Sequence, residues 1–218
     1  MLYTEKTLEQ ALKAGTFVPS PRDQLTPSAQ DLLRRRNLHG QDGKPEHMTH
    51  LKAGEQVPKT HPRIAFRGKL DSLEAVILLG MKEPGAPVEA LEEALDFCRQ
   101  LMRCDVLGEA VPEICLHGLS EADLRHRSHN PRRYYGTAHI LPTGEDSRIL
   151  LYLNYIRTQI RETELASYKA FPKRTDIHRA LNRLSSLLWI LCLEEREKSG
   201  KGGATWTGSL KKSQTDYS

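Results

Sequence analysis

Apolar residues recur at steps of three and four through residues 149–165, and this spacing predicts a long amphipathic helix. The apolar stripe consists of Ile149, Leu153, Ile156 and Ile160. A second set with the same spacing consists of Asn154, Arg157, Arg161 and Glu164. At about 100° per residue the second set lies beside the stripe, where an unpaired charge is costly. The polar set is therefore either a row of intrahelical ion pairs or part of a binding site.

Three further segments, 70–81, 88–107 and 175–196, show the same helical spacing, and shorter helices are expected at 7–14, 28–37 and 120–128. Strand signals are few. The sequence therefore predicts an all-α protein built as a helical bundle around four long helices. After residue 196 the pattern is lost, and we expect a disordered tail.

The segment from Leu38 to Gly68 is polar and rich in glycine and proline, and we expect an irregular loop there. A loop of this length in a compact domain is either disordered or functional. Its side chains favour function, because many of them are donors of the kind that bind phosphate: Lys44, His47, Thr49, His50, Lys59, His61, Arg63 and Arg67. The alternative is a metal site using His47, His50 and His61. No Walker-type phosphate loop is present.

Composition narrows the class of protein. The chain has 218 residues, 38% hydrophobic and 28% charged, with a formal net charge of +4. Mild basicity suits a small anionic ligand at least as well as nucleic acid. No apolar run is long enough to span a bilayer and the start of the chain lacks a secretory signal, so we expect a cytoplasmic protein with no membrane partner. The four cysteines form no Cys-x-x-Cys pair, and free thiols are expected.

Polar residues from three of the predicted helices fall beside their apolar stripes: Asp71, Arg157, Arg161, Glu164, Asn182 and Ser185. Structural ion pairs usually involve two partners. A polar cluster shared by three helices therefore favours a ligand site.

Three motifs occur in one order along residues 44–195. Val57–Leu73 contains a Val-x-Lys-x-x-x-Arg stretch that leads into an aspartate, Arg157–Glu164 reads Arg-Thr-x-x-Arg-x-x-Glu, and Leu181–Ser185 reads Leu-Asn-Arg-Leu-Ser. Together they resemble the ATP:cob(I)alamin adenosyltransferases. Three more segments resemble the ethanolamine-utilisation branch of that family: Leu25–Ala29, Lys44–Leu51 and Gly118–Glu121.

The resemblance implies a five-helix bundle at residues 44–197, preceded by a helical extension and loop at 1–43 and followed by a disordered tail at 198–218. It implies a homo-oligomer, a trimer or alternatively a dimer, with active sites between subunits. The implied catalytic residues are Arg157, Arg161 and Glu164. The implied ATP-binding residues are Lys44, Thr49, His50, Lys59, Arg67, Arg161, Glu164, Asn182 and Ser185. The implied cobalamin-binding residues are Asp71, Arg157, Tyr134, Tyr135, His139, Ile140 and Leu141, with Asp71 paired to Arg157.

The activity implied is transfer of the 5′-deoxyadenosyl group of ATP to cob(I)alamin, with Mg²⁺ bound to ATP near Glu164 and triphosphate released. A reductase would supply cob(I)alamin from cob(II)alamin, and the setting would be the cytoplasm or a bacterial microcompartment. Some ethanolamine-branch members carry a cysteine-rich insert, whereas this chain has no cysteine before Cys98, so we expect no structural iron or zinc. Two alternatives stay open: a non-catalytic bundle that carries or senses corrinoid or nucleotide, and a helical nucleic-acid-binding module using Arg34–Arg36.

Overall fold

The computed structural model describes residues 1–17, 23–39, 45–52, 54–137 and 139–200. Contacts divide the chain into two compact units, Met1–Thr49 and His50–Ser218. Lys44 and the tail from residue 201 lie outside the described residues.

The first unit contains β1 (Leu2–Tyr3), α1 (Glu5–Lys13), β2 (Gln24–Leu25) and α2 (Pro27–His39). The two short strands pair in parallel, with Leu2 opposite Gln24. Helix α1 begins in a capping box at Thr4, and α2 begins at a proline with Thr26 accepting from the Ala29 amide. Leu8 and Ala29 are fully buried between the two helices. Both helices were predicted within a few residues of these bounds.

Strands β3 (Met48–Lys52) and β4 (Glu55–Pro58) form a two-stranded sheet in a segment that was expected to be irregular. Helix α3 (Pro62–Gly80) follows and begins eight residues before the predicted start at residue 70. The reason is local: Pro62 occupies the first helical turn, where its missing N–H costs nothing, and the His61 ring accepts from the Arg63 amide at 3.2 Å. Pro62 therefore starts the helix instead of breaking it.

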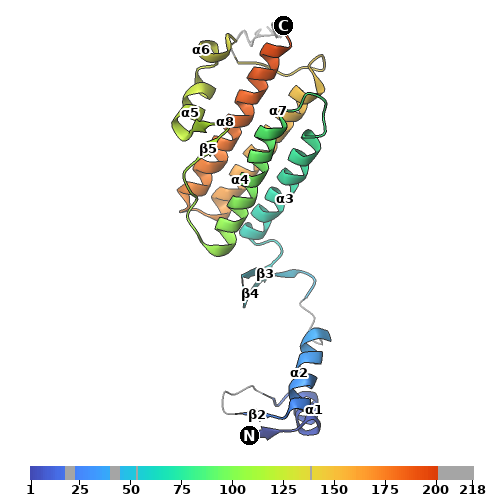
Figure 1. The fold of residues 1–218 in the computed structure, drawn as a ribbon. Helices are drawn as coiled ribbons and strands as arrows, with labels where there is room; N and C mark the ends of the chain where they lie inside the picture. Colours follow the sequence, from blue (N-terminus) through green and yellow to red (C-terminus); the bar gives the residue numbers. More distant parts are fainter. Residues whose placement is uncertain (18–22, 40–44, 53, 138, 201–218) are drawn as a thin grey trace, which may run out of the picture. The chain divides into compact units, whose positions relative to one another are not determined.

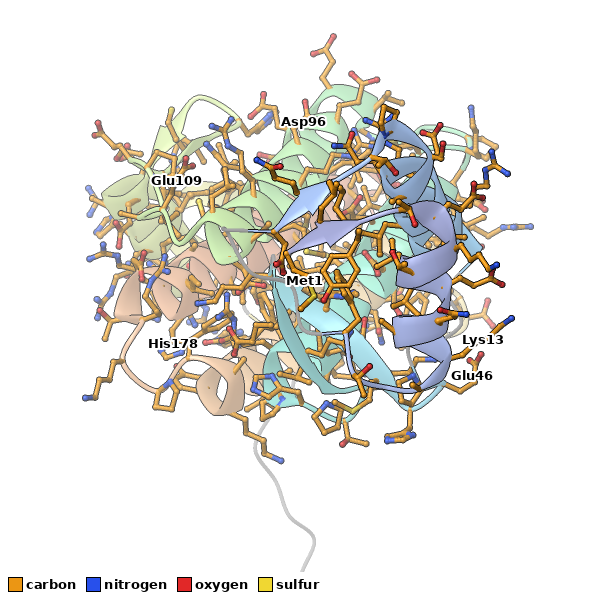
Figure 2. All side chains as sticks on the ribbon, turned by 90° about the horizontal axis from the view of Figure 1, so that it is seen from below. Met1, Lys13, Glu46, Asp96, Glu109 and His178 are labelled. Atoms are coloured by element: carbon orange, nitrogen blue, oxygen red, sulfur yellow. The ribbon has the colours of Figure 1, made fainter. Side chains whose placement is uncertain are left out.

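Four long helices lie side by side in the second unit (Figure 1): α3, α4 (Val88–Leu107), α7 (Arg148–Ala170) and α8 (Thr175–Lys198). Helix α7 packs between α3 and α8, and α4 packs on α3. Leucine, isoleucine and phenylalanine side chains fill the space between them, and charged side chains such as that of Asp96 on α4 project outward (Figure 2). The predicted all-α helical bundle is confirmed.

Between α4 and α7 the chain forms shorter elements. Helix α4 ends at Gly108, which has a φ of 73° and closes the helix in a left-handed conformation. Strands β5 (Cys115–Leu116) and β6 (Leu119–Ser120) then pair across a two-residue turn. Helix α5 (Glu121–His129), which begins in a capping box at Ser120, packs on α8, and α6 (Pro131–Tyr135) follows it.

A buried carboxylate joins the start of α3 to the end of α4. Asp105 is 1% exposed, and its two oxygens accept from Arg63 Nε at 2.7 Å and Arg67 Nε at 2.6 Å. Arg63 also donates to the Asp105 carbonyl at 2.7 Å. Two guanidiniums thus neutralise one buried charge and fix the first turns of α3.

Within the described residues, no helix combines the length and apolar character that a membrane crossing requires. Cys98, Cys104 and Cys192 are buried and Cys115 is exposed, and all four are free thiols.

Candidate functional site

The predicted apolar stripe of α7 is buried, since Ile149, Leu153, Ile156 and Ile160 are all less than 5% exposed. The polar row beside it grades from a buried Glu164 through a half-buried Arg157 to an exposed Arg161. Arg157 donates from Nε and Nη2 to Asn154 Oδ1, at 3.2 and 3.0 Å. Among the described residues neither Arg157 nor Arg161 forms an ion pair, so the alternative of an intrahelical ion-pair row is wrong.

Helix α8 presents a matching polar face to α7. Asn182 donates from Nδ2 to Glu164 Oε1 at 3.2 Å, which links the two helices through a carboxylate. Two turns further along α8, the ring of Trp189 lies under the Arg157 guanidinium, 5.5 Å from the ring centroid. This contact holds the Arg157 side chain against α8 by cation–π attraction.

These groups line a cavity of about 810 Å³. It is bounded by α5, α7, α8 and the segment at residues 139–141. Its lining comprises Arg125, Ser128, His129, His139, Ile140, Leu141, Arg157, Arg161, Asn182, Arg183, Ser185, Ser186 and Trp189.

The formal charges of the side chains that line this cavity are all positive. Four arginines line it and no aspartate or glutamate does. Burial lowers the pKa of Arg157, with the neighbouring Arg161 acting in the same direction, and burial also lowers the pKa of Arg183. A guanidinium nevertheless stays protonated at neutral pH, because its ordinary pKa is above 12. The cavity is therefore suited to a polyanion.

One end of the cavity is apolar and aromatic. Ile140 is buried, Leu141 is half-exposed, and the His139 ring lies 5.7 Å from the Trp189 ring. A ligand that combines several negative charges with a large flat apolar body would match both ends.

The structure brings together half of the residues that the resemblance assigned to the site: Arg157, Arg161, Asn182, Ser185, His139, Ile140 and Leu141 line the cavity, and Glu164 touches Asn182. The roles of these residues stay predictions.

Three other assigned residues do not line the cavity of this chain. Asp71 is exposed on α3, whose Leu70 and Leu73 are buried, and its assignment to a site between subunits stays a prediction. Tyr135 is buried in the bundle core, and Tyr134 contacts His126 at 2.9 Å. Neither tyrosine lines the cavity, and their assignment to cobalamin stays a prediction.

Arg67 also lies outside the cavity lining, and its assignment to ATP stays a prediction. Its guanidinium is held by Asp105, so it serves the packing of α3 on α4 and is not among the residues that line the cavity. Thr49 and His50 lie in β3, and Lys59 lies in the turn after β4. The His50 ring contacts Gln56 across the hairpin at 3.3 Å, while His61 caps α3. No cluster of metal-binding side chains occurs among the residues that the structure describes.

Sequence reasoning missed six of the lining residues: Arg125, Ser128, His129, Arg183, Ser186 and Trp189. A signal existed for two of the three on α8, because Ser186 and Trp189 follow Asn182 by four and seven residues and share its helix face. No comparable signal marked α5, whose position against α8 depends on contacts between segments far apart in sequence.

This chain is similar to proteins of one known family. The family model described as cobalamin adenosyltransferase matches residues 41–195. This chain belongs to the cobalamin adenosyltransferase family. Among curated relatives, Corrinoid adenosyltransferase EutT of Escherichia coli strain K12 is 36% identical over 159 residues, which cover 69% of this chain and 59% of that protein. The corresponding protein of Salmonella typhimurium strain LT2 is 35% identical over the same length.

Solved structures share the fold of this chain. Two variants of a PduO-type ATP:corrinoid adenosyltransferase from Lactobacillus reuteri, each complexed with cobalamin and ATP, match with TM-scores of 0.57 and 0.58. The first is 14% identical and covers 73% of this chain and 94% of its own. The second is 17% identical and covers 73% and 91%. At these identities the likeness concerns the fold. The chain matches about 59% of the length of the curated relatives.

Proposed function

We propose that this member of the cobalamin adenosyltransferase family transfers the 5′-deoxyadenosyl group of ATP to cob(I)alamin. The observation that carries the proposal is the cavity between α5, α7 and α8, which joins four arginines without a lining carboxylate to an end formed by Trp189, Ile140 and Leu141. ATP supplies the polyanion, and a corrin ring supplies the large apolar body.

The chemistry asks little of the protein beyond position and charge. The cobalt of cob(I)alamin attacks the ribose 5′ carbon of ATP, a cobalt–carbon bond forms, the carbon–oxygen bond breaks, and triphosphate leaves. The nucleophile belongs to the substrate, so no general base is needed. Arg157 and Arg161 would hold the two reactants and stabilise the negative charge that builds on the leaving triphosphate.

Glu164 and Asn182 are the residues that would position Mg²⁺ on the nucleotide. One carboxylate beside an amide fits this ion, because Mg²⁺ is commonly held by one or two carboxylates and by substrate phosphates. When bound, Mg²⁺ would neutralise part of the phosphate charge that a carboxylate would otherwise repel.

The assay that tests the proposal is anaerobic conversion of chemically reduced cobalamin and ATP to adenosylcobalamin, followed by absorbance. Arg161→Ala is expected to lower the rate by at least 100-fold, since losing one donor to a developing anion costs about 3–4 kcal/mol in the barrier. The residue is exposed, so helix content by circular dichroism should not change. Lys169→Ala, which removes an exposed charge from the same helix, is the matched control.

Normal turnover by Arg161→Ala would remove the catalytic assignment. Binding of ATP and corrinoid by the unaltered chain without any adenosylated product would instead favour the carrier or sensor alternative.

We also propose a homo-oligomer, a trimer or alternatively a dimer. Support comes from large apolar side chains exposed on the adjacent helices α3 and α7: Leu78, Leu79, Leu151, Tyr155 and Leu165. Light scattering coupled to size exclusion measures the copy number, and a monomer at micromolar concentration would contradict this proposal. A reductase as electron donor and a location in the cytoplasm or a microcompartment stay predictions of the family resemblance.

A further inference from the structure

Helix α5 runs alongside α8 in the same direction (Figure 1), so steps of about four residues along both helices define successive layers. In the first layer Glu121 of α5 pairs with Arg179 of α8, with Oε1 and Nε 3.4 Å apart. Leu124 is fully buried and anchors α5 on the bundle. One helical turn further, both helices place an arginine in the layer, Arg125 from α5 and Arg183 from α8.

This second layer lacks the carboxylate that the first one has. Arg183 is 6% exposed, and its Nε and Nη1 are buried without a hydrogen-bond partner among the described residues. Its Nη2 donates to the Asn182 side-chain oxygen. The other buried arginine of the described chain, Arg196, has a carboxylate partner, Asp146 at 2.9 Å. A buried cation without an acceptor is costly, and a second cation beside it adds repulsion.

The like charges face the cavity together with hydroxyl groups. Ser128 and Ser186, on the next layer, are both 8% exposed and line the same wall as Arg125 and Arg183. The charges that bear on Arg183 are those of Arg125, Glu121 and Glu164, and the two carboxylates belong to neighbouring layers where Arg179 and Asn182 already contact them. The missing partner of this layer is therefore an anion from outside the chain.

We propose that Arg125 and Arg183 form a phosphate subsite at the α5 side of the cavity, which takes the phosphate of a substrate. The inference rests on the proposed function for the identity of that substrate. Two of its reactants carry this chemistry: the polyphosphate chain of ATP and the phosphodiester in the nucleotide tail of cobalamin. We expect the ATP chain, because Asn182, which contacts Arg183, also contacts Glu164, the residue proposed to position Mg²⁺ on the nucleotide.

The test is calorimetric titration of the full chain with sodium tripolyphosphate, with Arg125→Gln as the main variant. Arg125 is exposed, so this variant should fold. We expect its dissociation constant to rise about tenfold, as for the loss of one charge-assisted hydrogen bond. Arg183→Gln should behave likewise. Arg179→Gln, one turn earlier on α8 and outside the cavity lining, is the matched control and should change the constant less than twofold.

A stability readout separates binding from simple charge loss. In phosphate-free buffer Arg125→Gln should unfold at the same temperature as the unaltered chain or at a higher one, since the repulsion in its layer is relieved. Added tripolyphosphate should raise the unfolding temperature of the unaltered chain more than that of the variant. Equal responses of Arg125→Gln and Arg179→Gln in both measurements would overturn the subsite.

Titrations with cobalamin and with cobinamide, which lacks the nucleotide tail, identify the source of the phosphate. A loss in Arg125→Gln that is confined to tripolyphosphate and ATP supports the ATP chain. A loss for cobalamin that is absent for cobinamide supports the phosphodiester of the corrinoid. The adenosylation assay tests the proposed function separately. If the unaltered chain forms product while Arg125→Gln and Arg183→Gln bind anions normally, the subsite alone is refuted. If the unaltered chain is inactive, the proposed function is refuted.

Discussion

The buried carboxylate of Asp105 offers the sharpest test of how the bundle is held together. Its side chain is fully buried and receives one guanidinium on each oxygen, Arg63 at 2.6 Å and Arg67 at 2.6 Å. Asp105→Asn keeps the shape of the side chain but removes its charge, which leaves two cations facing an amide. Removing one partner of a buried ion pair typically costs about 3–5 kcal/mol. We expect a loss near the lower end of that range, about 3 kcal/mol, because Arg63 retains the Asp105 carbonyl as an acceptor.

Urea unfolding followed by circular dichroism measures this loss. A change of about 3 kcal/mol is a large part of the stability of an ordinary domain and shifts the midpoint clearly. Asp96→Asn is the control on the same helix: its side chain is 77% exposed and pairs with Arg99, so its removal should cost less than about 1 kcal/mol. A loss in Asp105→Asn as small as that of the control would refute the reasoning. Adding Arg67→Met to Asp105→Asn should recover part of the loss, since one of the stranded cations is removed.

Three further outcomes follow from the structure. Hydrogen bonds from Arg174 and from the Val111 amide lower the pKa of Asp176, so the ionised Asp176 stabilises the fold above the ordinary pKa near 3.8, and this stabilisation is lost as the pH falls below that value. Asp176→Asn should therefore lower the free energy of unfolding by about 1–2 kcal/mol at pH 7, and the difference should shrink between pH 5 and pH 2 in unfolding experiments. A maleimide at pH 8 should label Cys115 rapidly and the other thiols only after unfolding, because burial protects those thiols and raises the pKa of Cys192 to about 12. Rapid labelling of a second thiol, detected by mass spectrometry, would contradict this prediction. Trp189→Leu should weaken corrinoid binding about fivefold by removing the ring under Arg157, whereas Trp189→Phe should weaken it less. Equal corrinoid affinities of the two variants and the unaltered chain in absorbance titrations would contradict a role of this contact in binding.

The long helices could be predicted because their signals are local and repeated. The stripe of α7 needs only its own spacing, and α4 matches its expected bounds because a left-handed glycine at Gly108 ends it. The start of α3 was missed because a proline such as Pro62 can either break a helix from within or start one at its first turn. Only the His61 cap decides between them.

The site was predictable in part, for a physical reason. A polar residue beside an apolar stripe must lie at the edge of a helix interface, so Arg157 and Asn182 could be placed near a groove from their own helices. The exposure of Asp71 could not be predicted, because it stands at the boundary of its stripe and the packing of α3 turns it to solvent. The pairing of Arg67 could not be predicted either, because its partner, Asp105, lies 38 residues away in sequence.

The part of the site that sequence reasoning could not reach is the wall made by α5, and it changes what the cavity can hold. Without α5 the groove between α7 and α8 would present Arg157 and Arg161 beside Glu164. With it, Arg125 faces Arg183 across a layer in which the preceding turn has an ordinary Glu121–Arg179 pair. A helix that served only to cover α8 would gain stability from a carboxylate in that second layer as well. The arginine at this position therefore points to a requirement outside folding, which is charge for a phosphate that only the ligand brings.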